Sequence, residues 1–135
     1  MKTAQGFTLV ELMVVILIIA ILAAVVSPMM RGRINSAKWS EGKTYMGTIA
    51  QAIRVHISET GGNFTSIPTL KQLGFTPGTL NGSYFTGGES GVGDFSWIIY
   101  SNNPVNFLIT ATAPSGINSP SQITLDHTGT FTEIP

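Results

Sequence analysis

An apolar run near the N-terminus constrains this chain more than any other feature. Fifteen consecutive apolar residues extend from Leu12 to Val26, and residues 7–10 lengthen the run to 20 positions with a single charge, Glu11. About 20 apolar residues span the hydrocarbon core of a bilayer as a helix. Because lipid offers the backbone no hydrogen-bond partners, a helix is favoured there even for β-branched residues. The sequence therefore predicts a membrane-spanning helix.

An ordinary secretory signal peptide or a plain membrane anchor explains this segment less well. One cation, Lys2, precedes the run, an acid interrupts it, and residues 21–28 offer no clean small-x-small cleavage site. A plain anchor also gives no reason for an intramembrane carboxylate, which costs about 2.5–3.5 kcal/mol at mid-bilayer. Glu11 is therefore a candidate functional residue, and an acid that snorkels to the membrane surface is the alternative.

The residues around Glu11 resemble the processing motif of the type IV pilin and pseudopilin superfamily. The motif stands directly before the apolar run and reads Gly6-Phe7-Thr8-Leu9-Val10-Glu11-Leu12. The resemblance covers about the first 55 residues. It implies that a prepilin peptidase cuts after Gly6 and methylates the new N-terminal residue, Phe7. It also implies that Thr8 and Glu11 serve assembly, with Glu11 of one subunit neutralising the Phe7 amine of a neighbour.

These features divide the chain into three expected parts: a leader at 1–6, a transmembrane and filament-core helix at 7–30, and a soluble globular head at 31–135. The resemblance places the leader in the cytoplasm and the head outside. The positive-inside rule predicts the reverse, because only Lys2 precedes the run whereas Arg31 and Arg33 follow it. On the resemblance, we expect a single-pass inner-membrane precursor and a periplasmic or extracellular filament.

The helix is expected to continue beyond the apolar run. Pro28 predicts a kink, with a helix terminator just outside the membrane as the alternative. Residues 34–60 then predict an amphipathic helix with one buried face, ended by Gly61 and Gly62. Its stripe follows steps of four, at Tyr45, Ile49, Ile53 and Ile57, with Ala37, Met46, Ala52 and His56 on or beside it.

The remainder of the chain predicts a small sheet. Residues 61–94 are rich in glycine and interrupted by prolines, which indicates irregular structure with a short helix at 69–73. Four strands are expected at 95–100, 106–112, 122–126 and 130–134, the last two joined by a hairpin turn. Phe107, Ile109 and Ala111 are assigned to one face, and Ile123 and Leu125 to another. The fold class is therefore α+β, a long N-terminal helix (membrane-spanning first half, amphipathic second half) packed on an antiparallel four-stranded sheet.

Little in the sequence indicates chemistry. The chain has no cysteine, and 7 basic residues balance 7 acidic ones, so neither thiol chemistry nor nucleic-acid binding is expected. His56 and His127 are isolated, and residues 87–94 lack the lysine of a phosphate-binding loop. After Asn102 only Asp126 and Glu133 could bind calcium, which requires more oxygen ligands. We expect no catalytic residue, metal or cofactor.

The resemblance implies a structural subunit of a type IV pilus-like filament, assembled by helix bundling, and not an enzyme. Its expected partners are further copies of the chain, the prepilin peptidase and the inner-membrane assembly machinery, and its expected roles lie in adhesion, motility or secretion. A pseudopilin of a type II secretion or DNA-uptake system is the alternative, as is a membrane-tethered minor pilin or adhesin. The chain lacks both the disulfide-closed loop of many major pilins and a rich calcium cluster.

Overall fold

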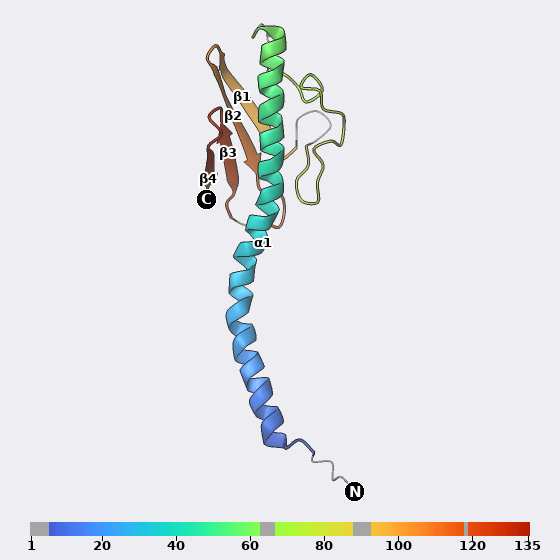
Figure 1. The fold of residues 1–135 in the computed structure, drawn as a ribbon, viewed down its shortest axis with the longest axis vertical. Helices are drawn as coiled ribbons and strands as arrows, with labels where there is room; N and C mark the ends of the chain where they lie inside the picture. Colours follow the sequence, from blue (N-terminus) through green and yellow to red (C-terminus); the bar gives the residue numbers. More distant parts are fainter. Residues whose placement is uncertain (1–5, 63–66, 88–92, 118) are drawn as a thin grey trace. The chain divides into compact units, whose positions relative to one another are not determined.

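The computed structural model describes residues 6–62, 67–87, 93–117 and 119–135. In this part of the chain a single helix, α1 (Leu9–Thr60), precedes a four-stranded antiparallel sheet (Figure 1). The strands pair in chain order and comprise β1 (Phe95–Asn102), β2 (Val105–Thr112), β3 (Gln122–Asp126) and β4 (Phe131–Ile134). The predicted α+β fold class is confirmed. Contacts divide the chain into two compact units, Met1–Ile34 and Asn35–Pro135.

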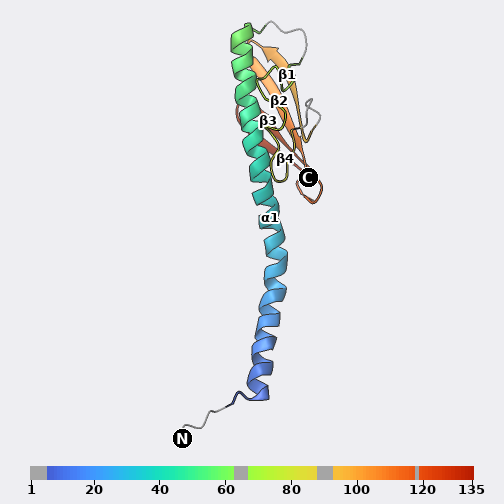
Figure 2. The same cartoon turned by 90° about the vertical axis from the view of Figure 1, so that its right-hand side faces the viewer.

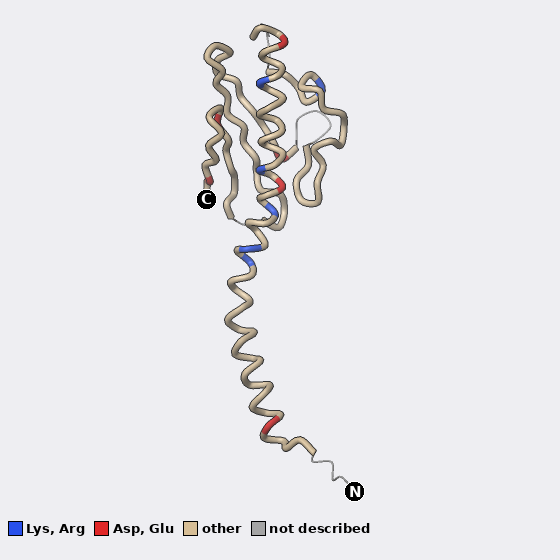
Figure 3. The backbone as a smooth tube through the Cα atoms, in the orientation of Figure 1, with Lys and Arg blue, Asp and Glu red and all other residues tan. Residues whose placement is uncertain are grey.

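The N-terminal unit contains the first part of α1, whose large hydrophobic side chains are all exposed, from 74% at Leu9 to 46% at Ile34. An 18-residue window of α1 reaches a mean hydropathy of 3.2 with none of it buried, so the helix is long and apolar enough to cross a membrane. No charged residue lies between Glu11 and Arg31 (Figure 3). Pro28 lies inside α1, so the helix-terminator alternative is wrong, and the kink stays a prediction.

The second part of α1 buries one face, as predicted. Its buried residues, however, are not spaced at the predicted steps of four. The buried residues follow steps of three and four, and they are Trp39, Gly42, Met46, Ile49, Ala50, Ile53 and Ile57. A helix has 3.6 residues per turn, so repeated steps of four drift around it by about 40° each. Counting back from Ile49 in fours therefore leads away from the core. Tyr45 is half-buried and Ala37 is exposed, whereas Trp39, which the stripe omitted, is 2% exposed.

Two glycines end the helix, as the sequence predicted. Gly61 and Gly62 have φ angles of 62° and 76°, in the left-handed region that side chains with a Cβ rarely adopt. The Gly62 N–H donates to the Ile57 carbonyl oxygen at 3.0 Å. This is the hydrogen bond of a Schellman motif, and it satisfies a carbonyl that the end of the helix would otherwise leave unpaired.

The sheet packs one face against α1 (Figure 2). In the register of β2 and β3, Ile109 lies opposite Leu125 and Ala111 lies opposite Ile123. Side chains on directly paired residues point to the same face, so the assignment of these two strands to different faces is wrong. All four side chains, together with Phe107, belong to one buried cluster. Two strands begin one residue away from their predicted starts, at Val105 and Phe131.

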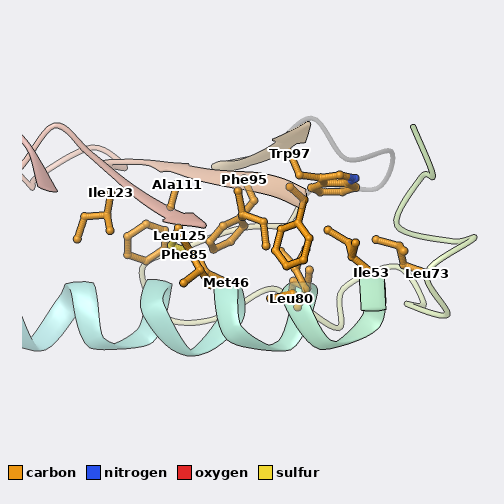
Figure 4. Close-up of a cluster of buried hydrophobic side chains, with 14 of the residues drawn as sticks. Met46, Ile53, Leu73, Leu80, Phe85, Phe95, Trp97, Ala111, Ile123 and Leu125 are labelled. Atoms are coloured by element: carbon orange, nitrogen blue, oxygen red, sulfur yellow. The ribbon is translucent and has the colours of Figure 1, made fainter. Parts of the chain in front are cut away.

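The connecting segment departs from the predicted short helix at 69–73. Only turns form there, with Leu73 N–H donating to Thr69 O at 3.0 Å and Gly74 N–H to Lys71 O at 3.1 Å. Nucleating a helix fixes several residues for a single hydrogen bond, and this segment is too short to add more. The segment nevertheless contributes Leu70, Leu73, Leu80 and Phe85 to the core. Figure 4 labels the last three of them. The glycine-rich stretch at 87–94 lies partly outside the described residues.

A carboxylate on α1 holds the connecting segment in place. Glu41 Oε1 accepts hydrogen bonds from the backbone N–H groups of Tyr84 and Phe85, both at 2.9 Å, and Oε2 accepts one from Ser83 at 3.1 Å. The Phe85 ring then lies against Gly42, where a Cβ would come within 2.8 Å of its Cζ atom. Position 42, directly after Glu41, must therefore be a glycine for the Phe85 ring to lie this close to the helix. We call Glu41, Gly42 and residues 83–85 the loop anchor.

Alanine substitutions at two glycines of α1 test the close contact between Gly42 and the Phe85 ring in the loop anchor. Gly42→Ala forces the Phe85 ring to move, and such overpacking costs about 1–3 kcal/mol. Gly47→Ala meets nothing within 4 Å and should instead stabilise the helix by about 0.5–1 kcal/mol. Urea unfolding of the full chain in detergent, followed by tryptophan fluorescence, measures both. Equal effects of the two substitutions would contradict the packing described here.

Glu41 also gives the head a predictable response to acid. Burial raises the pKa of its carboxyl group, but the N–H groups of Phe85, Tyr84 and Ser83 outweigh burial, and the pKa lies below the usual 4.5. A carboxyl group with a lowered folded-state pKa stabilises the fold above its unfolded pKa, and this stability is lost as the pH falls through the folded value. We therefore expect Glu41→Gln to be less stable at pH 7 and to lose less stability on acidification. Glu59→Gln, at an exposed position, is the control and should keep the pH profile of the unmodified chain.

Candidate functional site

The candidate site lies where α1 begins, on the residues that the sequence singled out. Gly6, Phe7 and Thr8 precede the first helical residue, Leu9, and Glu11 lies in the first turn. All are exposed, and nothing lies within 4 Å of the position that a Cβ on Gly6 would occupy. The peptide bond between Gly6 and Phe7 is therefore exposed and lies outside the helix.

The structure brings Thr8 and Glu11 together. Glu11 Oε2 accepts hydrogen bonds from the Thr8 backbone N–H at 2.9 Å and from the Thr8 hydroxyl at 2.8 Å. In return, the Glu11 N–H donates to Thr8 Oγ1 at 3.2 Å. This reciprocal arrangement is a capping box, which satisfies N–H groups that the start of a helix leaves without partners. It also places the carboxylate at the positive end of the helix dipole.

The capping box is a structural role for Glu11 that the sequence analysis missed. Its signal is present as Thr8-Leu9-Val10-Glu11, a threonine followed three positions later by glutamate, directly before an apolar run. The second carboxylate oxygen, Oε1, accepts no hydrogen bond from the residues that the structure describes. Glu11 can therefore cap its own helix through Oε2 and offer Oε1 to a second donor.

A charge pair between Glu11 and the nitrogen of Phe7 can form only after the peptide bond between Gly6 and Phe7 has been cleaved. In the uncleaved chain the Phe7 nitrogen is a peptide amide and carries no charge. Cleavage after Gly6 turns it into an amine, which is a cation at neutral pH. The pairing that the resemblance implies between Glu11 and Phe7 is therefore available only to the processed chain.

One face of α1 from Val10 onward is apolar. A hollow of about 720 Å³ runs along it, lined by Val10, Met13, Val14, Ile16, Leu17 and Ala20. Four of these residues repeat at intervals of three and four, which places them on one side of the helix. Side chains with this spacing form the ridges and grooves through which helices pack against each other.

The two acids considered for calcium binding, Asp126 and Glu133, have other partners. Glu133 forms an ion pair with Lys43 at 3.1 Å. Asp126 Oδ1 accepts hydrogen bonds from the Thr128 hydroxyl at 2.6 Å and from the Thr128 and Thr130 N–H groups, both at 2.9 Å, and these bonds lower its pKa. Asp126 thus organises the β3–β4 turn. Among the described residues no group of three histidine, cysteine or acidic side chains could hold a metal ion.

Comparison with known proteins finds a match at the N-terminus. The family described as the prokaryotic N-terminal methylation motif matches residues 1–27. No curated protein and no solved structure matches the chain. The family match covers the candidate site and the whole apolar run, and it confirms the resemblance over these residues.

The capping box can be tested at Thr8. Thr8→Val removes the hydroxyl that binds Glu11, and loss of such a cap costs about 1 kcal/mol. We expect faster hydrogen exchange at the Glu11 amide of the full chain in detergent micelles, measured by NMR. Thr8→Ser keeps the hydroxyl and should exchange as the unmodified chain does. Equal exchange in the valine and serine variants would show that the cap contributes nothing.

Proposed function

We propose that this chain, whose first 27 residues carry the leader signature of type IV pilins and pseudopilins, is a structural subunit of a type IV pilus-like filament. The observation that carries the proposal is the exposed apolar helix that begins within the signature and is 0% buried over its most hydrophobic window. An exposed apolar surface of this extent requires lipid or protein to cover it. In a subunit that moves from the membrane into a filament, lipid covers this apolar surface first and neighbouring subunits cover it afterwards.

Processing is the first step of the proposed function. The signature implies cleavage by a prepilin peptidase, which here would remove residues 1–6 and methylate the amine of Phe7. The exposed Gly6–Phe7 peptide bond is accessible for this reaction. Until assembly, residues 7–30 would anchor the subunit as a single-pass protein of the inner membrane, with the head outside.

Assembly is the second step. Helices from several subunits bundle through their apolar faces, which removes hydrocarbon surface from lipid and replaces it with packed side chains. Inside this bundle, Glu11 of one subunit pairs with the Phe7 amine of a neighbour through the available Oε1. An unpaired charge in such an apolar core is costly, whereas a hydrogen-bonded pair is much less so. The pair therefore penalises a wrong register between helices more than it adds to stability.

A pseudopilin would use the same processing and the same bundling. The two functions differ in where the filament ends, at the cell surface for a pilus and in the periplasm for a pseudopilus. The signature supports a structural role rather than catalysis. Electron microscopy of the producing cells, with antibody to the head, distinguishes surface filaments from periplasmic ones.

Substitution of Glu11 tests the assembly step. Glu11→Ala leaves the Phe7 amine of a neighbour buried without a partner, a loss that reaches about 3–5 kcal/mol for a buried pair. Insertion in the membrane should be unaffected, because alanine is less costly there than a charge. We therefore expect the variant to accumulate as processed protein and to form no filaments.

One measurement and one further variant serve as controls for this result. Mass spectrometry of the membrane pool should show loss of residues 1–6 and gain of one methyl group in both the variant and the unmodified chain. Glu11→Gln keeps the size and hydrogen-bonding capacity of the side chain without its charge, so it separates pairing from capping. Abundant filaments formed by Glu11→Ala alone would refute the pairing role.

A further inference from the structure

Two arginines directly after the apolar stretch differ from the other cations of α1. Arg31 and Arg33 are exposed, and neither forms an ion pair or a side-chain hydrogen bond with any described residue. By contrast, Lys38 donates to Gly116 O at 3.2 Å, Lys43 pairs with Glu133, and Arg54 donates to His127 O at 3.0 Å. Among the described residues of the N-terminal unit, no ion pair or side-chain hydrogen bond thus competes with an outside partner for the guanidinium groups of Arg31 and Arg33.

The position of these arginines along the helix indicates where that partner lies. Arg31 follows Glu11 by 20 residues, which corresponds to about 30 Å along a helix at 1.5 Å per residue. The hydrocarbon core of a bilayer is also about 30 Å thick. When Glu11 lies at one surface of the membrane, Arg31 therefore reaches the opposite surface. Figure 3 shows the uncharged stretch between them.

The two side chains reach the membrane surface on different sides of the helix. Residues two positions apart are separated by about 200° around an α-helix, so Arg31 and Arg33 leave α1 on nearly opposite sides. Gly32 between them adds no side chain, and nothing lies within 4 Å of where its Cβ would be. Each guanidinium can therefore reach a headgroup of its own.

The chemistry of the partner follows from the arginine side chain. A guanidinium presents its N–H groups in a planar fork that matches the oxygens of a phosphate, and its aliphatic stem can lie along apolar surface. Acidic competitors are distant or occupied along the chain. The nearest acid before Arg31 is Glu11, and the nearest after Arg33 is Glu41, whose carboxylate is held by three backbone N–H groups.

We propose that Arg31 and Arg33 bind the phosphates of two phospholipids where α1 leaves the membrane, with a preference for anionic headgroups. An anionic lipid is preferred because a zwitterionic headgroup carries its own cation beside the phosphate. The inference rests on the membrane anchoring in the proposed function and adds a lipid class to it. Bound phosphates fix the depth of the helix, and they must be released before the subunit enters a filament.

Arginine side-chain NMR tests this inference with an internal control. The chain has three arginines, so labelling with ¹⁵N-arginine gives three Nε–H signals, and Arg54 reports on the head. The full chain is placed in phosphatidylcholine bicelles, and phosphatidylglycerol is titrated in. We expect the Arg31 and Arg33 signals to shift and to exchange more slowly with solvent, while the Arg54 signal stays constant.

Variants give the expected size of the effect. An interaction of about 1 kcal/mol per cation at a membrane surface corresponds to about a fivefold change in affinity. Arg31→Gln and Arg33→Gln should each lower the apparent affinity for phosphatidylglycerol about fivefold, measured by native mass spectrometry of lipid adducts. Lys71→Gln removes the same charge from an exposed position in the connecting segment and should leave the affinity unchanged.

The outcomes separate this inference from the proposed function. A chain that stays in the bicelles, with Arg31 and Arg33 signals insensitive to phosphatidylglycerol, overturns lipid binding and leaves the anchoring intact. A chain that does not associate with bicelles at all overturns both. Equal shifts on adding inorganic phosphate to the chain in a nonionic detergent would show binding of any phosphate, and this too overturns the lipid site. An equal loss of affinity in Lys71→Gln would show that affinity depends only on net charge, and this also overturns the lipid site.

Discussion

The rest of the structure depends on the need to cover the apolar first part of α1. Its hydrophobic side chains are exposed throughout, and removing such surface from water is a dominant favourable term in membrane insertion and in protein association. No strand or loop of the described chain performs this burial, since every buried hydrophobic residue lies between Trp39 and Leu125. The proposed function assigns this covering to lipid before assembly and to other copies of the chain afterwards.

The single acid at the start of this helix is compatible with either environment because it has a local partner. The capping box with Thr8 satisfies one carboxylate oxygen within the chain, so Glu11 is never wholly without hydrogen bonds. The other oxygen can accept water at a membrane surface or an amine inside a helix bundle. An acid that caps its helix can thus pass between these environments with part of its hydrogen bonding unchanged.

The sequence predicted those features that follow from local pattern. The apolar run, the two glycines that end α1, the β3–β4 hairpin and the four strands each depend on residues that are close in sequence. What it missed depends on contacts between distant residues: Trp39 is buried because Phe85 packs beside it, with ring centroids 5.1 Å apart, and Glu41 binds the backbone more than 40 positions later. The same motif that indicates processing also contains the spacing of a capping box, and the side-chain geometry of Thr8 and Glu11 shows that the box forms.

The cations of α1 indicate how the chain can change its surroundings without changing its fold. Lys38, Lys43 and Arg54 each bind another element of the C-terminal unit, so their interactions accompany the head wherever it goes. Arg31 and Arg33 belong to the N-terminal unit, where we propose that they bind lipid phosphates. In the proposed function, exchanging lipid for neighbouring helices around the apolar stretch leaves the core unchanged, because the buried hydrophobic residues of the described chain all lie beyond Arg33. The charges that hold the fold are thus distinct from those that can respond to membrane or filament.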